Sequence, residues 1–210
     1  FLIRYREHWS GAGKRLPANA VDQLPGNRQK ILVHSNSSAL QEVISALVQQ
    51  GKNLHIFQSQ SAPLNEGLTQ ARKLSELGVK VTLITDAAVM QVMPMIDFAL
   101  LGADAIFEDA FLNKTGSHTI ALACRHFQKG LYVVADSRKW IRHADYPAQV
   151  IRSLKEEQPK PAEDLLEGDT KGIEVRNYYF ELTPNAWVTA FISDQPVFGE
   201  PESRDRHEGL

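Results

Sequence analysis

Short β-branched runs alternate with longer segments of helical periodicity between residues 30 and 135, and this regularity constrains the fold of the 210-residue chain most. The predicted strands are Ile31–Val33, Leu54–Phe57, Val79–Ile84, Phe98–Leu101 and Leu131–Ala135. The predicted helices between them are Ala39–Gln50, Glu66–Leu77, Ala88–Met95 and Ser117–Phe127. Strands separated by helices of about ten residues are typical of βαβ crossovers in a parallel sheet. The pattern therefore predicts an α/β fold, a mostly parallel sheet with helices on both faces.

Three glycines support the predicted helix ends. Gly51, Gly78 and Gly130 each fall between a predicted helix and the next strand. A glycine just past the last helical residue readily adopts the left-handed conformation that ends a helix. We therefore expect a helix to stop at each of these positions.

The segments outside this core carry weaker signals. Apolar residues recur at helical spacing in Phe1–Trp9, which predicts the end of an amphipathic helix, and Gly, Pro and Asn residues then indicate a linker up to residue 29. The stretch "IRSLKEEQPKPAEDLLEGDTKG" after residue 141 is charged and contains proline, as is typical of an exposed excursion. "IEVRNYYFELT" alternates like a strand, and "PNAWVTAFIS" predicts a closing helix. The expected organisation is residues 1–29 as helix end and linker, 30–196 as the α/β domain and 197–210 as a polar tail.

Composition excludes several classes of protein. With 43% hydrophobic and 23% charged residues the chain is typical of a soluble globular protein, and its formal net charge of −2 gives no reason to expect nucleic-acid or acidic-membrane binding. No apolar run approaches the roughly 20 residues that span a bilayer, and Arg4, Arg6 and Glu7 exclude a signal peptide at the start. The single cysteine excludes an intramolecular disulfide and a cysteine-based zinc cluster, and it fits a cytoplasmic location. Because the chain begins at Phe1 rather than Met, we expect a fragment or a processed product.

Polar residues follow all five predicted strands. Each polar run alone is explained by the caps and turns that βα loops need. In an open parallel sheet, however, ligands bind in the crevice beyond the carboxyl ends of the strands. We therefore interpret the five runs together as one small-molecule pocket. They are His34–Ser38, Gln58–Ser61, Thr85–Asp86, Gly102–Asp104 and Asp136–Lys139.

Phosphate is a plausible ligand group for this pocket. Ser37 and Ser38 open one predicted helix and Asn113–His118 opens another, and helix N-termini offer free N–H groups and a positive dipole end to an anion. Lys114 adds a cation there, although a solvated loop lysine is an equally good interpretation. The sequence contains no Walker pattern and no G-x-G-x-x-G, so no nucleotide cofactor is predicted.

Other reactive side chains favour structural roles. Cys124 shares a helical face with apolar residues, which predicts a core position rather than a nucleophile. His118 and His126 lack the i, i+4 spacing of a helical metal pair, and His34 and His55 fall at strand positions where satisfied core histidines are common. No metal site is predicted.

The order of several motifs resembles one known superfamily. It joins methylthioribose-1-phosphate isomerases, ribose-1,5-bisphosphate isomerases and the alpha, beta and delta subunits of eukaryotic translation initiation factor 2B. The resemblance covers about residues 30–193 and implies a Rossmann-like C-terminal domain, with Phe1–Trp9 as the remnant of a helical N-terminal domain. The matching motifs, in order, are "ILVHSNSSAL", "SAPLNEG", "VTLITD", "LLGADAI", "NKTGSHTIALACRH", "LYVVAD" and "NYYFELTP".

The resemblance implies roles for individual residues. The catalytic aspartate of the isomerases maps to Asp104, and their substrate-binding Asn-Lys pair maps to Asn113 and Lys114. Their catalytic cysteine maps to Ser35, so the thiol is missing, and an arginine typical of the second βα loop falls at Ala62. The isomerases' Arg-Gly phosphate loop belongs to N-terminal sequence that this chain lacks.

The run His34–Ser38 is closer to the initiation-factor subunits, which have lost the cysteine and serve regulation. It would form the first wall of the family pocket, with His34 and Asn36 as binding residues. One hypothesis is therefore a regulatory, non-catalytic protein that binds a phosphosugar or a nucleotide. The alternative is an aldose–ketose isomerase acting on a sugar 1-phosphate. The resemblance further implies a homodimer and a protein partner in translation. No cofactor is predicted.

Overall fold

Six parallel strands form the main sheet of the protein. The computed structural model describes residues 15–156, 159–166, 168 and 171–195. The sheet has the order β3-β2-β1-β4-β7-β9, and every neighbouring pair is parallel. This arrangement confirms the predicted α/β fold. The strands are β1 (Arg28–Val33), β2 (Asn53–Ser59), β3 (Lys80–Ile84), β4 (Phe98–Gly102), β7 (Gly130–Val134) and β9 (Ala190–Ile192).

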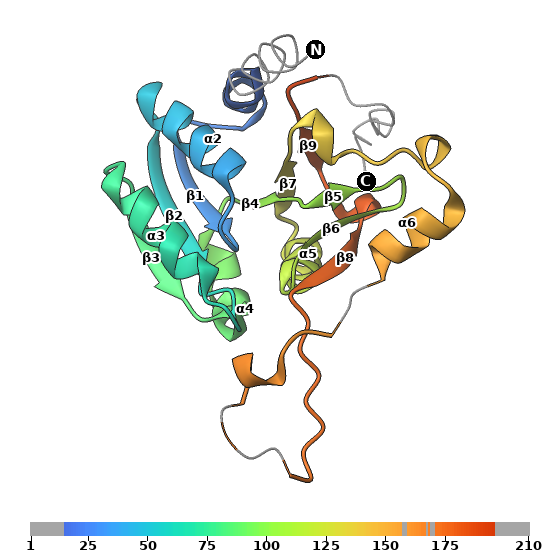
Figure 1. The fold of residues 1–210 in the computed structure, drawn as a ribbon. Helices are drawn as coiled ribbons and strands as arrows, with labels where there is room; N and C mark the ends of the chain where they lie inside the picture. The colour runs from blue at the N-terminus through green and yellow to red at the C-terminus, as the bar shows by residue number, and fades with distance from the viewer. Residues whose placement is uncertain (1–14, 157–158, 167, 169–170, 196–210) are drawn as a thin grey trace, which may run out of the picture.

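Helices cover both faces of this sheet (Figure 1). On one face lie α2 (Ser38–Gln49), α3 (Glu66–Glu76) and a helix formed by residues 15–23. On the other face lie α4 (Val89–Val92) and α5 (Ser117–His126). The side chains of β1 alternate between the two cores, as expected for a strand buried on both sides: Ile31 and Val33 join the first core and Leu32 joins the second.

A small antiparallel sheet accompanies the main one. It has the order β5-β6-β8, with β5 at Ala105–Ile106, β6 at Ala110–Lys114 and β8 at Phe180–Pro184. The sequence did not predict it, because strands β5 and β6 are short and β8 joins them from far along the chain. Helix α5 packs between this sheet and the strands β4 and β7. Between α6 (Ala148–Lys155) and β8 the chain makes the expected excursion away from the body (Figure 1).

Two sequence-based predictions at the ends of the described chain are corrected. The expected linker contains the helix of residues 15–23, whose Leu16 and Ala20, with Leu24 just beyond it, are buried in the core under α2. The predicted closing helix is instead a 3₁₀ turn, Asn185–Trp187, followed by β9. The expected helix end at Phe1–Trp9 and the tail 197–210 lie outside the described residues.

The helix ends follow the glycine prediction in two cases of three. Gly51 and Gly78 adopt φ values of 74° and 77° directly after the caps of α2 and α3. Gly130 instead belongs to β7, and Gln128 takes the left-handed position after α5 with φ 54°. No helix in the described part of the chain is long and apolar enough to cross a membrane.

The predicted helix Ala88–Met95 is broken. A 3₁₀ turn at Asp86–Ala88 leads into the four-residue α4, and a second 3₁₀ turn follows at Met93–Met95. Pro94 lacks the backbone N–H that a continuing helix would use.

Candidate functional site

A cavity of about 290 Å³ opens at the point where the strand order of the main sheet reverses. Strands β1 and β4 are neighbours there, and their following loops run in opposite directions, which leaves a crevice at the carboxyl ends of the strands. Five of the six predicted site residues line it, namely His34, Ser35, Asn36, Asp104 and Asn113. The other lining residues are Ser37, Ser38, Ala39, Gly102, Ala103, Val134, Ala135, Asp136, Arg138 and Lys139.

The first wall of the cavity is the loop from β1 into α2. Ser35 leaves the strand with φ 64°, and Ser37 caps α2 by accepting a hydrogen bond from the Leu40 N–H at 3.3 Å. The end of β4 approaches this cap closely. A Cβ on Gly102 would lie 2.9 Å from Ser37 Oγ, so only glycine fits at that position without displacing the cap.

His34, the first residue after β1, anchors this wall through hydrogen bonds to Ser59 and Thr115. It is 1% exposed, and its Nε2 lies 2.8 Å from the Thr115 carbonyl oxygen. Because a carbonyl only accepts, Nε2 carries the hydrogen and Nδ1 accepts from Ser59 Oγ at 2.5 Å. Burial lowers the pKa of His34 below its ordinary value of 6.5, which keeps the ring neutral at neutral pH. Both ring nitrogens are thus engaged within the protein, and His34 ties the first loop to the start of α5.

Asp104 and Lys139 bring opposite charges to the cavity. Burial raises the pKa of Asp104 above its ordinary value of 3.8, and nearby Lys139, whose Nζ lies 3.9 Å from Asp104 Oδ1, opposes the rise. Lys139 comes from the loop after β7, which the sequence analysis identified as polar without singling out this residue. The position of β7 beside β4 is what brings Lys139 to the site.

Arg138, the other cation in the lining, is held by its neighbour Asp136. Its Nε donates to Oδ1 at 2.9 Å and its Nη2 to Oδ2 at 2.8 Å, a two-pronged pair that lowers the pKa of Asp136. The lysine beside it has only the longer contact to Asp104 in the cavity lining. Lys139 is therefore the better placed of the two to meet an anionic ligand.

Asn113 and Lys114 close β6 and point to opposite sides of it, as successive strand residues do. Asn113 lines the cavity and donates to Ser117 Oγ at 2.8 Å. The Lys114 side chain is only 2% exposed, and its ammonium group pairs with Glu66 at 3.0 Å and lies 4.9 Å from the centre of the Tyr179 ring. Lys114 does not line the cavity, so a ligand contact would require breaking this ion pair.

The expected anion site at the start of α5 is already filled by a side chain of the protein. Glu181 Oε1, from β8, accepts hydrogen bonds from the Gly116 N–H at 2.7 Å and the His118 N–H at 2.8 Å. A carboxylate at this place satisfies the free N–H groups and the helix dipole as a phosphate would. Glu181 thus occupies the place at the start of α5 where the stretch Asn113–His118 was expected to hold a phosphate. The sequence did not indicate Glu181, because it arrives from a strand 65 residues away from Gly116.

Cys124 has the core position expected of it, whereas His55 is hydrogen-bonded but only half-buried and belongs to no core cluster. Cys124 on α5 is 1% exposed in the second core, and burial raises the pKa of its thiol to about 12. His55 on β2 stacks on Phe57 and its Nε2 lies 2.8 Å from Thr82 Oγ1. Among the described residues, no group of three or more His, Cys, Asp or Glu is arranged to hold a metal ion.

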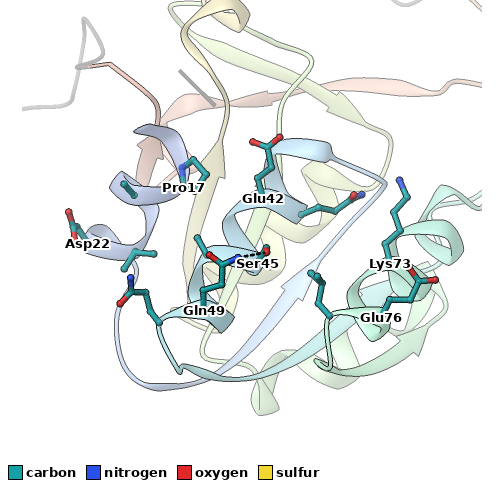
Figure 2. Close-up of a pocket in the computed structure, with 13 residues that line it drawn as sticks. Pro17, Asp22, Glu42, Ser45, Gln49, Lys73 and Glu76 are labelled. Atoms are coloured by element: carbon teal, nitrogen blue, oxygen red, sulfur yellow. Dashed lines mark hydrogen bonds between the residues drawn. The ribbon is translucent and has the colours of Figure 1, made fainter. Parts of the chain in front are cut away.

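A wider groove of about 760 Å³ lies elsewhere, along the solvent side of α2. Figure 2 shows that the helix of residues 15–23 and α3 flank it, with Glu42, Lys73 and Glu76 among its polar side chains. It contains none of the residues that follow the strands at their carboxyl ends. The smaller cavity is the better candidate, because it combines a switch point with convergent polar groups.

Known proteins with similar sequences belong to one family of initiation-factor subunits and sugar-phosphate isomerases. The chain matches the model of the Initiation factor 2 subunit family over residues 3–199. It is 33% identical over 167 residues to a protein named ribose 1,5-bisphosphate isomerase from Methanocaldococcus jannaschii, covering 78% of this chain and 53% of that protein. It is 30% identical over 202 residues to a putative translation initiation factor eIF-2B subunit 2-like protein from Pyrococcus horikoshii, covering 96% of this chain and 67% of the relative.

A solved structure agrees with these relatives. The crystal structure of translation initiation factor eIF-2B, subunit delta, from A. fulgidus matches with a TM-score of 0.78 at 28% identity, over 90% of this chain and 58% of that one. The chain thus spans about half the length of the first-named relative.

Proposed function

Because the chain belongs to the initiation factor 2 subunit family, we propose that it is a regulatory, non-catalytic protein whose switch-point cavity binds a phosphosugar. The observation that carries the proposal is the composition of the cavity wall, which retains Asp104 but presents Ser35 where the resembling isomerases have a cysteine. The family resemblance also supports a homodimer and a protein partner in translation.

Loss of the thiol argues against catalysis. A cysteine with a pKa near 8.5 exchanges a proton readily around neutral pH, whereas a serine hydroxyl is far too weak an acid to do so without a base beside it. His34 is not such a base, because both of its ring nitrogens are already engaged with Ser59 and Thr115. Cys124 is no replacement either, because it is buried and its pKa is raised to about 12.

The lining favours a phosphosugar over a nucleotide. Its serine hydroxyls, the Asn113 amide and the Asp104 carboxylate can bond the hydroxyls of a sugar, and Lys139 can pair with a phosphate. None of the described residues that line the cavity is Phe, Tyr or Trp, so a nucleobase would have no aromatic ring to stack on. A nucleoside monophosphate is therefore the weaker ligand in this proposal.

The alternative function is an aldose–ketose isomerase acting on a sugar 1-phosphate. It is favoured by the isomerase names of several relatives and by the presence of Asp104 and Asn113 in one cavity. It differs from the main proposal only in turnover, because both require the same ligand class.

Calorimetric titration of the chain tests the binding proposal. Ribose 1,5-bisphosphate and methylthioribose 1-phosphate should bind, and AMP should bind more weakly. Lys139→Ala should weaken phosphosugar binding about tenfold, the value of one charge-assisted hydrogen bond. Lys73→Ala, in the groove of Figure 2, is the matched control and should have no effect. Equal affinities for Lys139→Ala and the parent chain would show that this lysine is not the phosphate contact.

A further inference from the structure

Several residues in the first two βα loops have left-handed backbone conformations that are unfavourable for residues other than glycine. Ser35 and Ser61 both have φ 64°, and Asn65 has φ 57°. Such residues cost of order 1–3 kcal/mol and persist only where surrounding contacts fix them. Ser35 lines the cavity, so whatever holds its conformation also shapes the site.

Asp86 fixes the second loop from the end of the neighbouring strand. It is the first residue of the 3₁₀ turn that follows β3. Its Oδ1 accepts from the Ser61 N–H at 2.8 Å, and its Oδ2 accepts from the Ala62 N–H at 2.8 Å. One carboxylate thus accepts from two successive backbone N–H groups. An Asn side chain has only one acceptor oxygen and a water molecule carries no charge, so neither could replace both bonds.

Ser61 transmits this constraint to the first loop. Its hydroxyl, fully buried, accepts from the Ser35 N–H at 2.7 Å. Gln58, also fully buried, donates to the Ser35 carbonyl oxygen at 3.2 Å. Both backbone groups of Ser35 are therefore held by side chains from β2 and the loop after it, and Asp86 holds that loop at Ser61 and Ala62.

We propose that Asp86, acting through Ser61, is a positioning residue of the ligand site: it fixes the left-handed backbone of Ser35 and with it the first wall of the cavity. The claim that this wall matters for a ligand rests on the proposed function. The claim that Asp86 fixes the wall does not, and the two are tested separately.

A thiol at position 35 provides a readout that needs no ligand. The natural cysteine, Cys124, is 1% exposed, so in a Ser35→Cys chain alkylation by iodoacetamide reports on position 35. Adding Asp86→Ala or Ser61→Ala should raise the alkylation rate at least threefold at a temperature well below unfolding, because the loop is released. The matched control is Asp97→Ala. Asp97 also accepts a backbone N–H, from Lys30 at 2.7 Å, but it precedes β4 at the opposite end of the sheet, so its loss should leave alkylation unchanged.

Ligand affinity is measured on the same substitutions in the native Ser35 background. Asp86→Ala and Ser61→Ala should weaken ribose 1,5-bisphosphate binding about tenfold or more, and Asp97→Ala should not. If one of the two variants fails to fold, as judged by circular dichroism, the other decides.

An unchanged alkylation rate in Asp86→Ala and Ser61→Ala would show that Asp86 does not fix the wall, whatever the affinity. Faster alkylation with an unchanged ligand affinity would show that the wall does not shape ligand binding. A parent chain that binds no phosphosugar contradicts the proposed function instead, and the alkylation rates then decide alone whether Asp86 fixes the wall.

Discussion

At the scale of single residues, the site depends on which charges are already paired within the protein. Lys114 is committed to Glu66, and Arg138 to Asp136. Asp104 and Lys139 contact each other only at 3.9 Å, which leaves both able to form shorter bonds to a ligand. Lys114 and Lys139 therefore differ in whether a close ion pair within the protein already occupies the ammonium group, and only Lys139 is left able to bind a ligand.

Asp104 should lower the stability of the folded protein at neutral pH. Folding raises its pKa, so the folded state binds this proton more tightly than the unfolded state does. Its stabilising contribution is complete below the ordinary value of 3.8 and is lost as the pH rises through the folded value. Asp104→Asn should therefore raise the melting temperature at pH 7, with a gain that shrinks as the pH falls through the raised folded value and disappears below 3.8. The gain should be small, because the Asp104 side chain is 48% exposed and solvent screens its charge. A lower melting temperature for Asp104→Asn than for the parent at pH 7 would contradict the raised pKa.

At the scale of elements, the sequence predicted the parts that local pattern determines. All five predicted strands appear close to the predicted positions, because apolar periodicity and β-branched runs are local signals, although the helix of the third βα unit is broken. The predicted strand "IEVRNYYFELT" contains most of β8, but β5, β6 and β9 were missed, and the pairing of β8 with β6 and of β9 with β7 joins segments far apart in the chain. The same limit applies to the site. The polar strand ends were evident from the sequence, but Glu181 over α5 and Lys139 beside Asp104 depend on tertiary arrangement.

The junction between β4 and α2 gives a test at this scale. In Gly102→Ala the new methyl group would lie 2.9 Å from Ser37 Oγ and 3.1 Å from Ser37 Cβ, so we expect a loss of about 1–3 kcal/mol in the free energy of unfolding. Gly at position 37 removes the obstructing atoms, and glycine is itself an acceptable N-cap that costs only a few tenths of a kcal/mol. The double variant Gly102→Ala/Ser37→Gly should therefore be more stable than Gly102→Ala alone in urea unfolding. Strictly additive effects would show that the two residues do not interact.

At the scale of the whole molecule, the expected homodimer remains a prediction. The apolar segment "AWVTAFI" gives it no further support, because its two aromatic side chains have partners within the protein: Trp187 packs on His118, and Phe191 packs on Phe111 and Trp140. The prediction thus rests on family resemblance. Sedimentation velocity at micromolar concentration should show a symmetric dimer. A single monomeric species at that concentration would refute it.

The central claim is that the cavity binds a phosphosugar without converting it. Positioned acid–base groups contribute about 10²–10⁴-fold each, so the loss of one of two should remove most turnover and leave binding largely intact. The most direct measurement is to incubate the native chain with ribose 1,5-bisphosphate and with methylthioribose 1-phosphate, and to follow binding and product formation on the same samples. We predict saturable binding with no product above the uncatalysed background. Turnover at about 1 s⁻¹ or faster, abolished by Asp104→Asn, would contradict the account and establish the isomerase instead.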